Sequence, residues 1–395
     1  MCKPTMLSLA TLLFCGALAS SALGQPTADD PDWLLRRVID VPDPWAVHIS
    51  WFDSAIYVGR RNSGDDGVFR IELDNTLTKI VGGSRPAGVF ADPLDGDVYF
   101  TEDYGGSLFR WANPDGPKET WVSGWHSGDD DPCGMAVAPA TYMGPVLLPG
   151  QAVMIDRGSG SEDGLWGFSL DMPENEWEIV GNSSALQDAV DVAISDTDVY
   201  IADAAADVIW ILQGDGTLLD LQTSEPLDGP CAITIDPVSG DLIVAESVNK
   251  RIVRIDPLTG NVAVMFSGFL DLPWASVEIS MDGVDIVVSD STGDKVYVFS
   301  LCESDYYPYE DCNGNGFRDF CDIANGTSED VDFNGVPDEC ECVGDLDGDN
   351  DCDQGDLGIL LAAYLKDGGG DLDHDGDTDQ SDLGILLYKY GSICD

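Results

Sequence analysis

The chain has few basic residues. Only 18 of its 395 residues are Lys or Arg, against 73 Asp or Glu, and the formal net charge is −55 at pH 7. A nucleic-acid-binding surface needs clustered positive charge, so we expect no nucleic-acid partner. Histidine is also scarce, with only His48, His126 and His374 in the whole chain. Only His126 has a loop context, but no Ser or Cys nucleophile accompanies it. We therefore assign no catalytic residue.

Long apolar runs are absent beyond the N-terminus. Met6 to Leu18 is mostly apolar, and Ala22-Leu-Gly24 supplies the small residues that a signal peptidase reads. Residues 1–24 are therefore predicted to be a signal peptide and residues 25–37 a linker, with an uncleaved anchor as the alternative. No later run is long enough to span a bilayer. The sequence predicts a protein that is secreted, outside the cell or at its surface.

Helical periodicity is absent from residues 38–300. Short apolar runs recur there with a period near 43 residues. The first run of each unit begins at Pro44, Pro86, Pro132, Ala189, Pro230 or Pro273. Second, third and less regular fourth runs follow, rich in β-branched and aromatic residues and bounded by Gly, Pro, Asp and Asn. Four short strands in each of six units predict a mainly β fold, a six-bladed β-propeller. A β-sandwich would not explain the repeat.

Two phrases link this span to known propellers. Val199-Tyr-Ile-Ala-Asp203 and the segment from Ile252 to Gly260 resemble NHL-repeat and gluconolactonase-like propellers. The gluconolactonase-like enzymes hold a divalent metal in the channel and carry Glu-Gly-Pro in the first blade. Here that region reads Val41-Pro-Asp-Pro-Trp45, so the resemblance implies the fold more than lactonase activity.

Acidic residues end the second strand in five of the six units. They are Glu102 or Asp103, Asp156, Asp203, Glu246 and Asp290. A carboxylate there can accept backbone N–H bonds in the next turn. Because such a role would recur in every repeat, we interpret these residues as structural and not as a metal or catalytic ring. Cys133 and Cys231 occupy equivalent positions in units three and five, and we expect buried thiols.

Two copies of an acidic loop, 345–356 and 371–382, dominate the C-terminus. A twelve-residue calcium loop supplies oxygen ligands from positions 1, 3, 5, 7, 9 and 12. In the first loop these are Asp345, Asp347, Asp349, Asp351, Asp353 and Asp356. In the second they are Asp371, Asp373, Asp375, Asp377, Asp379 and Asp382. Position 7 ligates through its backbone carbonyl. Gly376 fits the sharp turn at position 6, whereas Asn350 departs from it.

A helix is predicted after each loop. Leu357, Leu360, Leu361 and Tyr364 fall at helical spacing, as do their counterparts in the second copy. Residues 342–395 thus resemble a type I dockerin, a small α-helical domain of paired EF-hand-like units (F-hands). The resemblance implies bound Ca²⁺ and a cohesin-bearing partner that either half can dock. The residues that would face this partner are Gln354, Gly355, Gln380 and Ser381. An acidic solvated tail is the alternative.

A second duplication, with a 19-residue period, lies in residues 301–341. Oxygen-bearing side chains recur at loop positions 1, 3, 5, 9 and 12, with Gly at position 6. They are Asp311, Asn313, Asn315, Asp319 and Asp322, then Asp330, Asp332, Asn334, Asp338 and Glu341. These residues resemble thrombospondin type 3 calcium repeats, with a flexible acidic linker as the alternative. Seven cysteines fall in the last 95 residues, which suggests disulfides in an exported protein. Cys342 and Cys394 could join the ends of the dockerin-like segment.

The parts together predict binding and assembly. We expect a secreted calcium-binding protein whose dockerin-like module anchors a propeller with a carbohydrate or protein ligand to an extracellular cohesin-type partner. One alternative is a propeller hydrolase or lyase that acts on carbohydrate or a lactone in polysaccharide breakdown. Another is a structural component of the cell envelope.

Overall fold

The computed structural model describes residues 25–391 with short interruptions. These fall at residues 62–63, 83–84, 93–94, 103–106, 113–115, 124–131, 158–163, 171, 182–185, 270–275, 304–309, 332–334, 339, 341–343, 348–351, 367–368 and 373–375. The predicted signal peptide, His126, His374, and Cys342 with Cys394 all lie outside the described residues. The chain divides into two compact units, which meet in sequence between Leu301 and Cys302.

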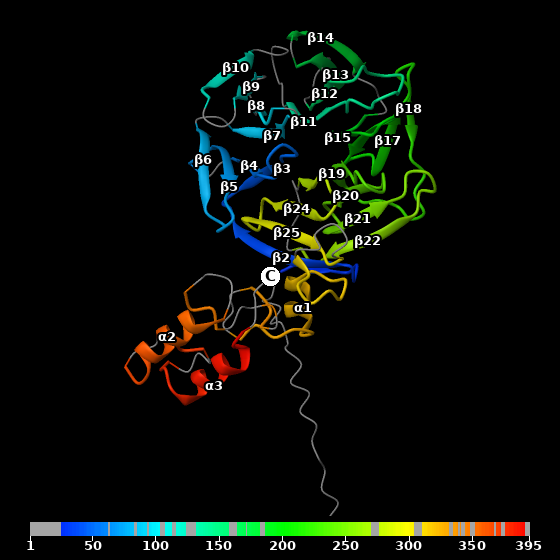
Figure 1. The fold of residues 1–395 in the computed structure, drawn as a ribbon. Coiled ribbons are helices and arrows are strands. Elements are labelled where there is room, and N and C mark those ends of the chain that lie inside the picture. The colour runs from blue at the N-terminus through cyan, green and yellow to red at the C-terminus, as the bar shows by residue number, and fades with distance from the viewer. Residues whose placement is uncertain are drawn as a thin grey trace, which may run out of the picture. The chain divides into compact units, whose positions relative to one another are not determined.

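The first unit is a six-bladed β-propeller, which confirms the predicted fold (Figure 1). Blade 1 comprises β3 (Pro44–Ile49), β4 (Ile56–Arg60), β5 (Gly67–Ile71) and β6 (Leu77–Gly82). Blade 2 comprises β7 (Pro86–Ala91), β8 (Val98–Glu102), β9 (Ser107–Trp111) and β10 (Lys118–Val122). Blade 3 comprises β11 (Pro132–Val137), β12 (Gln151–Asp156), β13 (Gly164–Ser169) and β14 (Met172–Gly181). All three are antiparallel sheets in sequence order.

The other three blades follow the same order. Blade 4 comprises β15 (Ala189–Ile194), β16 (Val199–Asp203), β17 (Val208–Leu212) and β18 (Leu218–Asp220). Blade 5 comprises β19 (Pro230–Ile235), β20 (Leu242–Glu246), β21 (Arg251–Ile255) and β22 (Val262–Ser267), with β1 (Thr27–Ala28) at its edge. Blade 6 comprises β23 (Val277–Ile279), β24 (Asp285–Asp290) and β25 (Lys295–Leu301), with β2 (Trp33–Asp40) as its outermost strand.

The innermost strands form a closed ring. Each contacts the innermost strand of the next blade, and β23 of blade 6 contacts β3 of blade 1. Figure 1 shows β3, β7, β11, β15 and β19 towards the centre and β6, β10, β14 and β18 on the rim. Apolar side chains fill the space between blades; the Phe266 and Phe299 rings, from blades 5 and 6, stack 3.8 Å apart. Burial of these side chains is the main stabilising contribution.

The N-terminal strands were not anticipated. Residues 25–37 were predicted to be a linker, yet β1 and the first part of β2 lie there. Strand β2 pairs with β25 from Trp33 opposite Leu301 to Asp40 opposite Lys295. It thereby covers an edge that would otherwise expose unpaired backbone groups, and it joins the start of the propeller to its end.

The second unit is small and, in the part that the structure describes, has three short helices, α1 (Asp319–Asn325), α2 (Gln354–Ala363) and α3 (Gln380–Lys389). Its apolar core consists of the fully buried Cys352, Leu360 and Leu386, with five partly buried neighbours. The disulfides Cys302–Cys321 and Cys312–Cys340 lie in its first half. Such bonds are typical of extracellular proteins. None of the helices in the described residues has the length and apolar character needed to cross a bilayer.

Candidate functional site

The helices α2 and α3 begin in the same way. Asp353 caps α2, and the carboxylate of Asp356 accepts a hydrogen bond from the Asp353 N–H at 2.7 Å. Asp379 caps α3, and Asp382 accepts from its N–H at 2.6 Å. The backbone angles also agree, with φ −132° and ψ −151° at Asp353 against −133° and −152° at Asp379. The reciprocal bonds satisfy N–H groups that a helix start leaves without partners.

The two halves exchange equivalent hydrogen bonds. The Leu365 N–H donates to the Thr378 carbonyl at 2.8 Å, and the Gly391 N–H donates to the Cys352 carbonyl at 2.7 Å. The two donors occupy the same place in their copies of the duplication, and so do the two acceptors. Leu360 and Leu386, which also correspond, are both fully buried in the shared core. The duplicated sequence therefore forms a pair of units related by a pseudo-twofold axis.

The last residue of each loop is a buried carboxylate. Asp356 and Asp382 are both fully buried. Burial alone would raise the pKa of Asp356, but backbone N–H bonds from Asp353, Leu346 and Asp347 outweigh it, and the pKa is lowered. The carboxyl group is thus held ionised, the form in which a carboxylate binds Ca²⁺.

Carboxylate oxygens converge in both loops. One cluster joins Asp345, Asp347 and Asp356, and the other joins Asp377, Asp379 and Asp382, each with its oxygen atoms within 4.8 Å of one another. Hard oxygen donors of this kind suit Ca²⁺, so these acidic clusters can hold a metal ion. Asp377 contributes its side chain to the second cluster, whereas the sequence analysis assigned it a backbone role. The other predicted dockerin ligands, Asp349, Asp351, Asp373 and Asp375, lie outside the described residues.

Three of the four predicted calcium loops share one turn. In each, the N–H of the glycine at position 6 donates to the carboxylate at position 1, and the glycine has a positive φ that side chains disfavour. The pairs are Gly316 with Asp311 at 2.9 Å, Gly335 with Asp330 at 3.0 Å and Gly376 with Asp371 at 2.9 Å. In the two loops of residues 301–341, the connector loops, the N–H at position 2 also donates to the carboxylate at position 9. These carboxylates are Asp319 and Asp338, both at 3.0 Å.

In the first connector loop, the side chains of Asn313 and Asn315 contact Asp322. This carboxylate is buried and accepts hydrogen bonds from the side-chain amides of Asn313 and Asn315 at 2.9 to 3.2 Å. A rotated amide would present oxygen in place of nitrogen. Cys312 and Cys340 lie beside Asp319 but are bonded to each other and do not ligate. The predicted ligands Asp332, Asn334 and Glu341 lie outside the described residues.

The four residues predicted to face a partner are exposed. Gln354 and Gly355 open α2, and Gln380 and Ser381 open α3. Each pair follows its N-cap aspartate directly, so the equivalent caps hold both pairs in equivalent places. The predicted apolar stripe is only partly buried, since Leu361 and Leu387 are 52% and 56% exposed.

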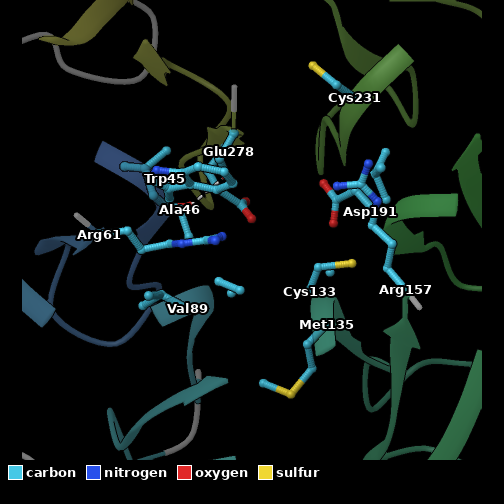
Figure 2. A pocket seen from close by; sticks show the side chains of 16 residues that line it. Trp45, Ala46, Arg61, Val89, Cys133, Met135, Arg157, Asp191, Cys231 and Glu278 are labelled. Atoms are coloured by element: carbon cyan, nitrogen blue, oxygen red, sulfur yellow. Dashed lines mark hydrogen bonds between the residues drawn. The ribbon is translucent and has the colours of Figure 1, made fainter. Parts of the chain in front are cut away.

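The propeller contains a cavity of about 220 Å³ at the ring of innermost strands. All six blades contribute to its wall, and Figure 2 shows Arg61, Asp191 and Glu278 pointing into it. Arg61 and Arg157 reach it from the residue that follows the second strand of blades 1 and 3. These residues were not predicted from the sequence. A usable signal exists at Asp191, which departs from the small residues at the equivalent positions of other blades, and in the arginine that blades 1 and 3 share after the second strand.

Charged groups of both signs face this cavity. The Arg61 guanidinium carbon lies 3.5 Å from the centre of the Trp45 ring. Arg157 forms two hydrogen bonds with Asp188, at 2.6 and 2.9 Å. The Glu278 Oε1 atom lies 3.3 Å from the His48 Nδ1 atom, and the other Glu278 oxygen accepts a hydrogen bond from the Thr234 hydroxyl at 3.2 Å.

Asp191 is the most perturbed acid of the cavity. Burial raises its pKa to about 7, and repulsion from Glu278 adds to the rise. Hydrogen bonds from the Ile233 and Val192 N–H groups lower the pKa but do not offset the effect of burial. Burial likewise raises the pKa of the Cys133 thiol to about 12, so this cysteine stays protonated at neutral pH. Cys133 and Cys231 line the cavity and form no disulfide; Cys133 is partly buried and Cys231 is buried. Among the cavity residues that the structure describes, no three potential metal ligands converge.

Three of the acidic residues at the ends of the second strands accept hydrogen bonds from backbone N–H groups. Asp203 accepts from the Gln187, Asp188 and Ala206 N–H groups, Glu246 from Asp228, and Asp290 from Gly293. Asp203, Glu246 and Asp290 are fully buried, and none of the three lines the cavity. Their geometry agrees with the structural role inferred from recurrence.

Comparison with known proteins places the propeller among solved folds. No protein-family model and no curated protein matches the chain. A structural genomics protein of unknown function from Bacteroides thetaiotaomicron matches with a TM-score of 0.53 and 13% identity, over 69% of this chain and 73% of that one. A gluconolactonase from Xanthomonas campestris matches with a TM-score of 0.53 and 14% identity, over 71% and 98%. The propeller fold is shared. At these identities the likeness shows the fold alone.

A lyase structure is also among the matches. Virginiamycin B lyase from Staphylococcus aureus matches with a TM-score of 0.48 and 15% identity, over 68% of this chain and 99% of that one.

Proposed function

We propose that the protein is an extracellular, calcium-dependent assembly protein. Its C-terminal pair of loop-helix units docks onto a cohesin-type partner and thereby anchors a ligand-binding propeller. The observation that carries this proposal is the pseudo-twofold pair, with matched caps at Asp353 and Asp379 and reciprocal hydrogen bonds from Leu365 and Gly391. An unstructured acidic tail would not form matched helix caps and reciprocal hydrogen bonds in both copies.

Calcium would make the docking face rigid. In each loop, three carboxylates converge directly beside the first residues of a helix, and those first residues are the exposed pair. Without a cation these charges repel one another. With it, the loop fixes the start of α2 or α3 and so positions Gln354-Gly355 or Gln380-Ser381. The connector loops, with the same turn at position 6, would bind further ions and stiffen the link to the propeller.

Binding of the full chain to a panel of purified cohesin domains, with Ca²⁺ and with EDTA, tests the proposal. We expect at least one cohesin to bind in Ca²⁺ and to be released by EDTA. Failure of every cohesin, with the calcium sites shown to be filled, would contradict docking of this type.

Variants of the exposed pairs test the two docking modes. Replacing either Gln354-Gly355 or Gln380-Ser381 by charged residues removes one of two similar faces. The loss is then about 0.4 kcal/mol, which is RT ln 2 and far below the 1.4 kcal/mol of a tenfold change. Replacing both pairs should abolish binding in the same titration. If one single change already abolishes it, one half alone carries recognition.

A further inference from the structure

Asp191 breaks the pattern of the propeller. Strand pairing aligns it with one position in every blade, because Asp191 pairs with Ala202 as Ala46 pairs with Gly59 and Ala232 with Ala245. The equivalent residues in the other blades are all small: Ala46, Gly88, Gly134, Ala232 and Ser276. A residue that recurs in the repeat serves the fold, so the exception at the centre of the ring requires another explanation.

The neighbouring blade makes room for this side chain. A Cβ atom placed on Gly134 of blade 3 would lie 2.5 Å from the Asp191 Oδ1 atom. The Asp191 side chain therefore extends across the inner ring towards blade 3, and Figure 2 shows its carboxylate directed into the cavity. Glu278 of blade 6 points into the same space and repels it. A cation between the two carboxylates would relieve this repulsion.

The wall across the cavity from Asp191 carries Arg61 of blade 1, on the same side as Glu278 of the adjacent blade 6 (Figure 2). Arg61 lies in the cavity wall with its face against the Trp45 ring. A guanidinium stacks through its face and carries N–H groups along its planar edge, in a geometry that matches a carboxylate. The equivalent position is Arg157 in blade 3, Ala204 in blade 4 and Ser247 in blade 5, so an arginine at this position is no general feature of the repeat. Apolar side chains, among them Val47, Val89 and Met135, line the wall between the charged groups.

We propose that the central cavity binds a small zwitterion of free-amino-acid size, with its carboxylate on Arg61, its ammonium group between Asp191 and Glu278, and an apolar body against Val89 and Met135. The cavity of about 220 Å³ accommodates a molecule of this class. The inference rests on the proposed role of the propeller as the ligand-binding part, and it names the ligand class and the site.

Calorimetric titration of the full chain with three matched probes tests the charge requirement. The probes are leucine, isocaproate, which lacks the ammonium group, and isoamylamine, which lacks the carboxylate. We expect leucine to bind at least about tenfold more tightly than either analogue. If isocaproate bound as tightly as leucine, the site would be an anion site. If isoamylamine bound as tightly as leucine, it would be a cation site. Either result, or no binding of leucine, would refute the proposal.

Two variants of Asp191 separate binding from folding. Asp191→Asn keeps an oxygen acceptor for the Ile233 N–H, and Asp191→Ala introduces the residue that blades 1 and 5 carry at this position. We expect both to lower leucine affinity at least about tenfold and not to weaken isocaproate binding, because the loss of a negative charge removes repulsion of an anion. The control Glu119→Ala removes an exposed carboxylate of β10 and should change neither. Unchanged leucine affinity in a folded Asp191→Asn protein would overturn the assignment.

The same titration in EDTA separates this inference from docking. Cohesin binding requires the calcium loops, whereas the cavity lies within the propeller unit. Leucine binding that persists in EDTA, in a protein that docks to no cohesin, would contradict the docking function alone. Docking without leucine binding would contradict the cavity assignment alone.

Discussion

Removal of calcium with EDTA is expected to unfold residues 302–395 and to leave the propeller folded. Among the described residues, the C-terminal apolar core has only three that are fully buried, Cys352, Leu360 and Leu386. From Leu301 onward the chain carries 26 Asp and Glu against 3 Lys and Arg. On the proposed function, we expect bound calcium to supply most of the folding free energy of this unit. A ligand present at a thousand times its Kd contributes about 4 kcal/mol for each site, comparable with the whole stability of so small a unit.

Differential scanning calorimetry of the full chain measures this effect. Two transitions are expected in Ca²⁺ and only the propeller transition in EDTA, with a loss of helical signal in circular dichroism. Asp371→Ala should remove one calcium site and loosen α3, because its carboxylate accepts the Gly376 N–H bond that shapes the loop. Absence of a C-terminal transition even in Ca²⁺ would support the acidic-tail alternative, and a C-terminal transition that persists in EDTA would contradict a role of metal in folding this unit. A propeller transition lowered by EDTA would indicate a metal within the propeller.

The strands were predictable where the signal was local. Five of the six innermost strands begin at the predicted residue, at Pro44, Pro86, Pro132, Ala189 and Pro230; the sixth predicted start, Pro273, lies outside the described residues. Strand β2 was missed because its partner, β25, lies at the opposite end of the propeller sequence, and nothing in Trp33–Asp40 distinguishes pairing with it from an extended linker. Ring closure is a long-range property, and a periodic pattern does not reveal it.

The helices show a second limit. Spacing placed Leu361 and Leu387 on the buried stripe, but both are more than half exposed. Two short helices and a few loop residues such as Leu346 and Leu372 bury a narrow strip, which the fully buried Leu360 and Leu386 already fill. Periodicity gives the face of a helix, whereas the width of the buried strip depends on what covers it.

The cavity shows a third limit. A search for repeats finds what blades share, and so it found the carboxylates at strand ends. Asp191 differs from its equivalents in the other blades, and Arg61 from those in blades 4 and 5; the observed strand pairing places these residues in the cavity wall. The elements that are common to all blades serve the fold, and the exceptions are the candidates for function.

Asp203→Ala is expected to destabilise the propeller by about 4 kcal/mol. The carboxylate is fully buried and accepts the Gln187, Asp188 and Ala206 N–H groups at 2.8 to 3.1 Å, and the Trp210 indole N–H at 3.2 Å. Its removal leaves these donors without an acceptor, and each buried unsatisfied donor costs about 1–3 kcal/mol unless water reaches it. Thermal unfolding should show a fall of about 10 °C in the Tm of the propeller transition.

Two further variants make this result specific. Asp203→Asn keeps one carbonyl oxygen and should lose about half as much stability, because hydrogen bonds to a charged acceptor are roughly twice as strong as neutral ones. Glu119→Ala removes an exposed carboxylate and should change stability by less than about 0.5 kcal/mol. If Asp203→Ala kept its full Tm and instead lost ligand binding, the carboxylates at the strand ends would belong to a functional ring. A large loss of stability in Asp203→Ala, with leucine affinity retained by the folded fraction, would instead assign them to the frame that holds the cavity.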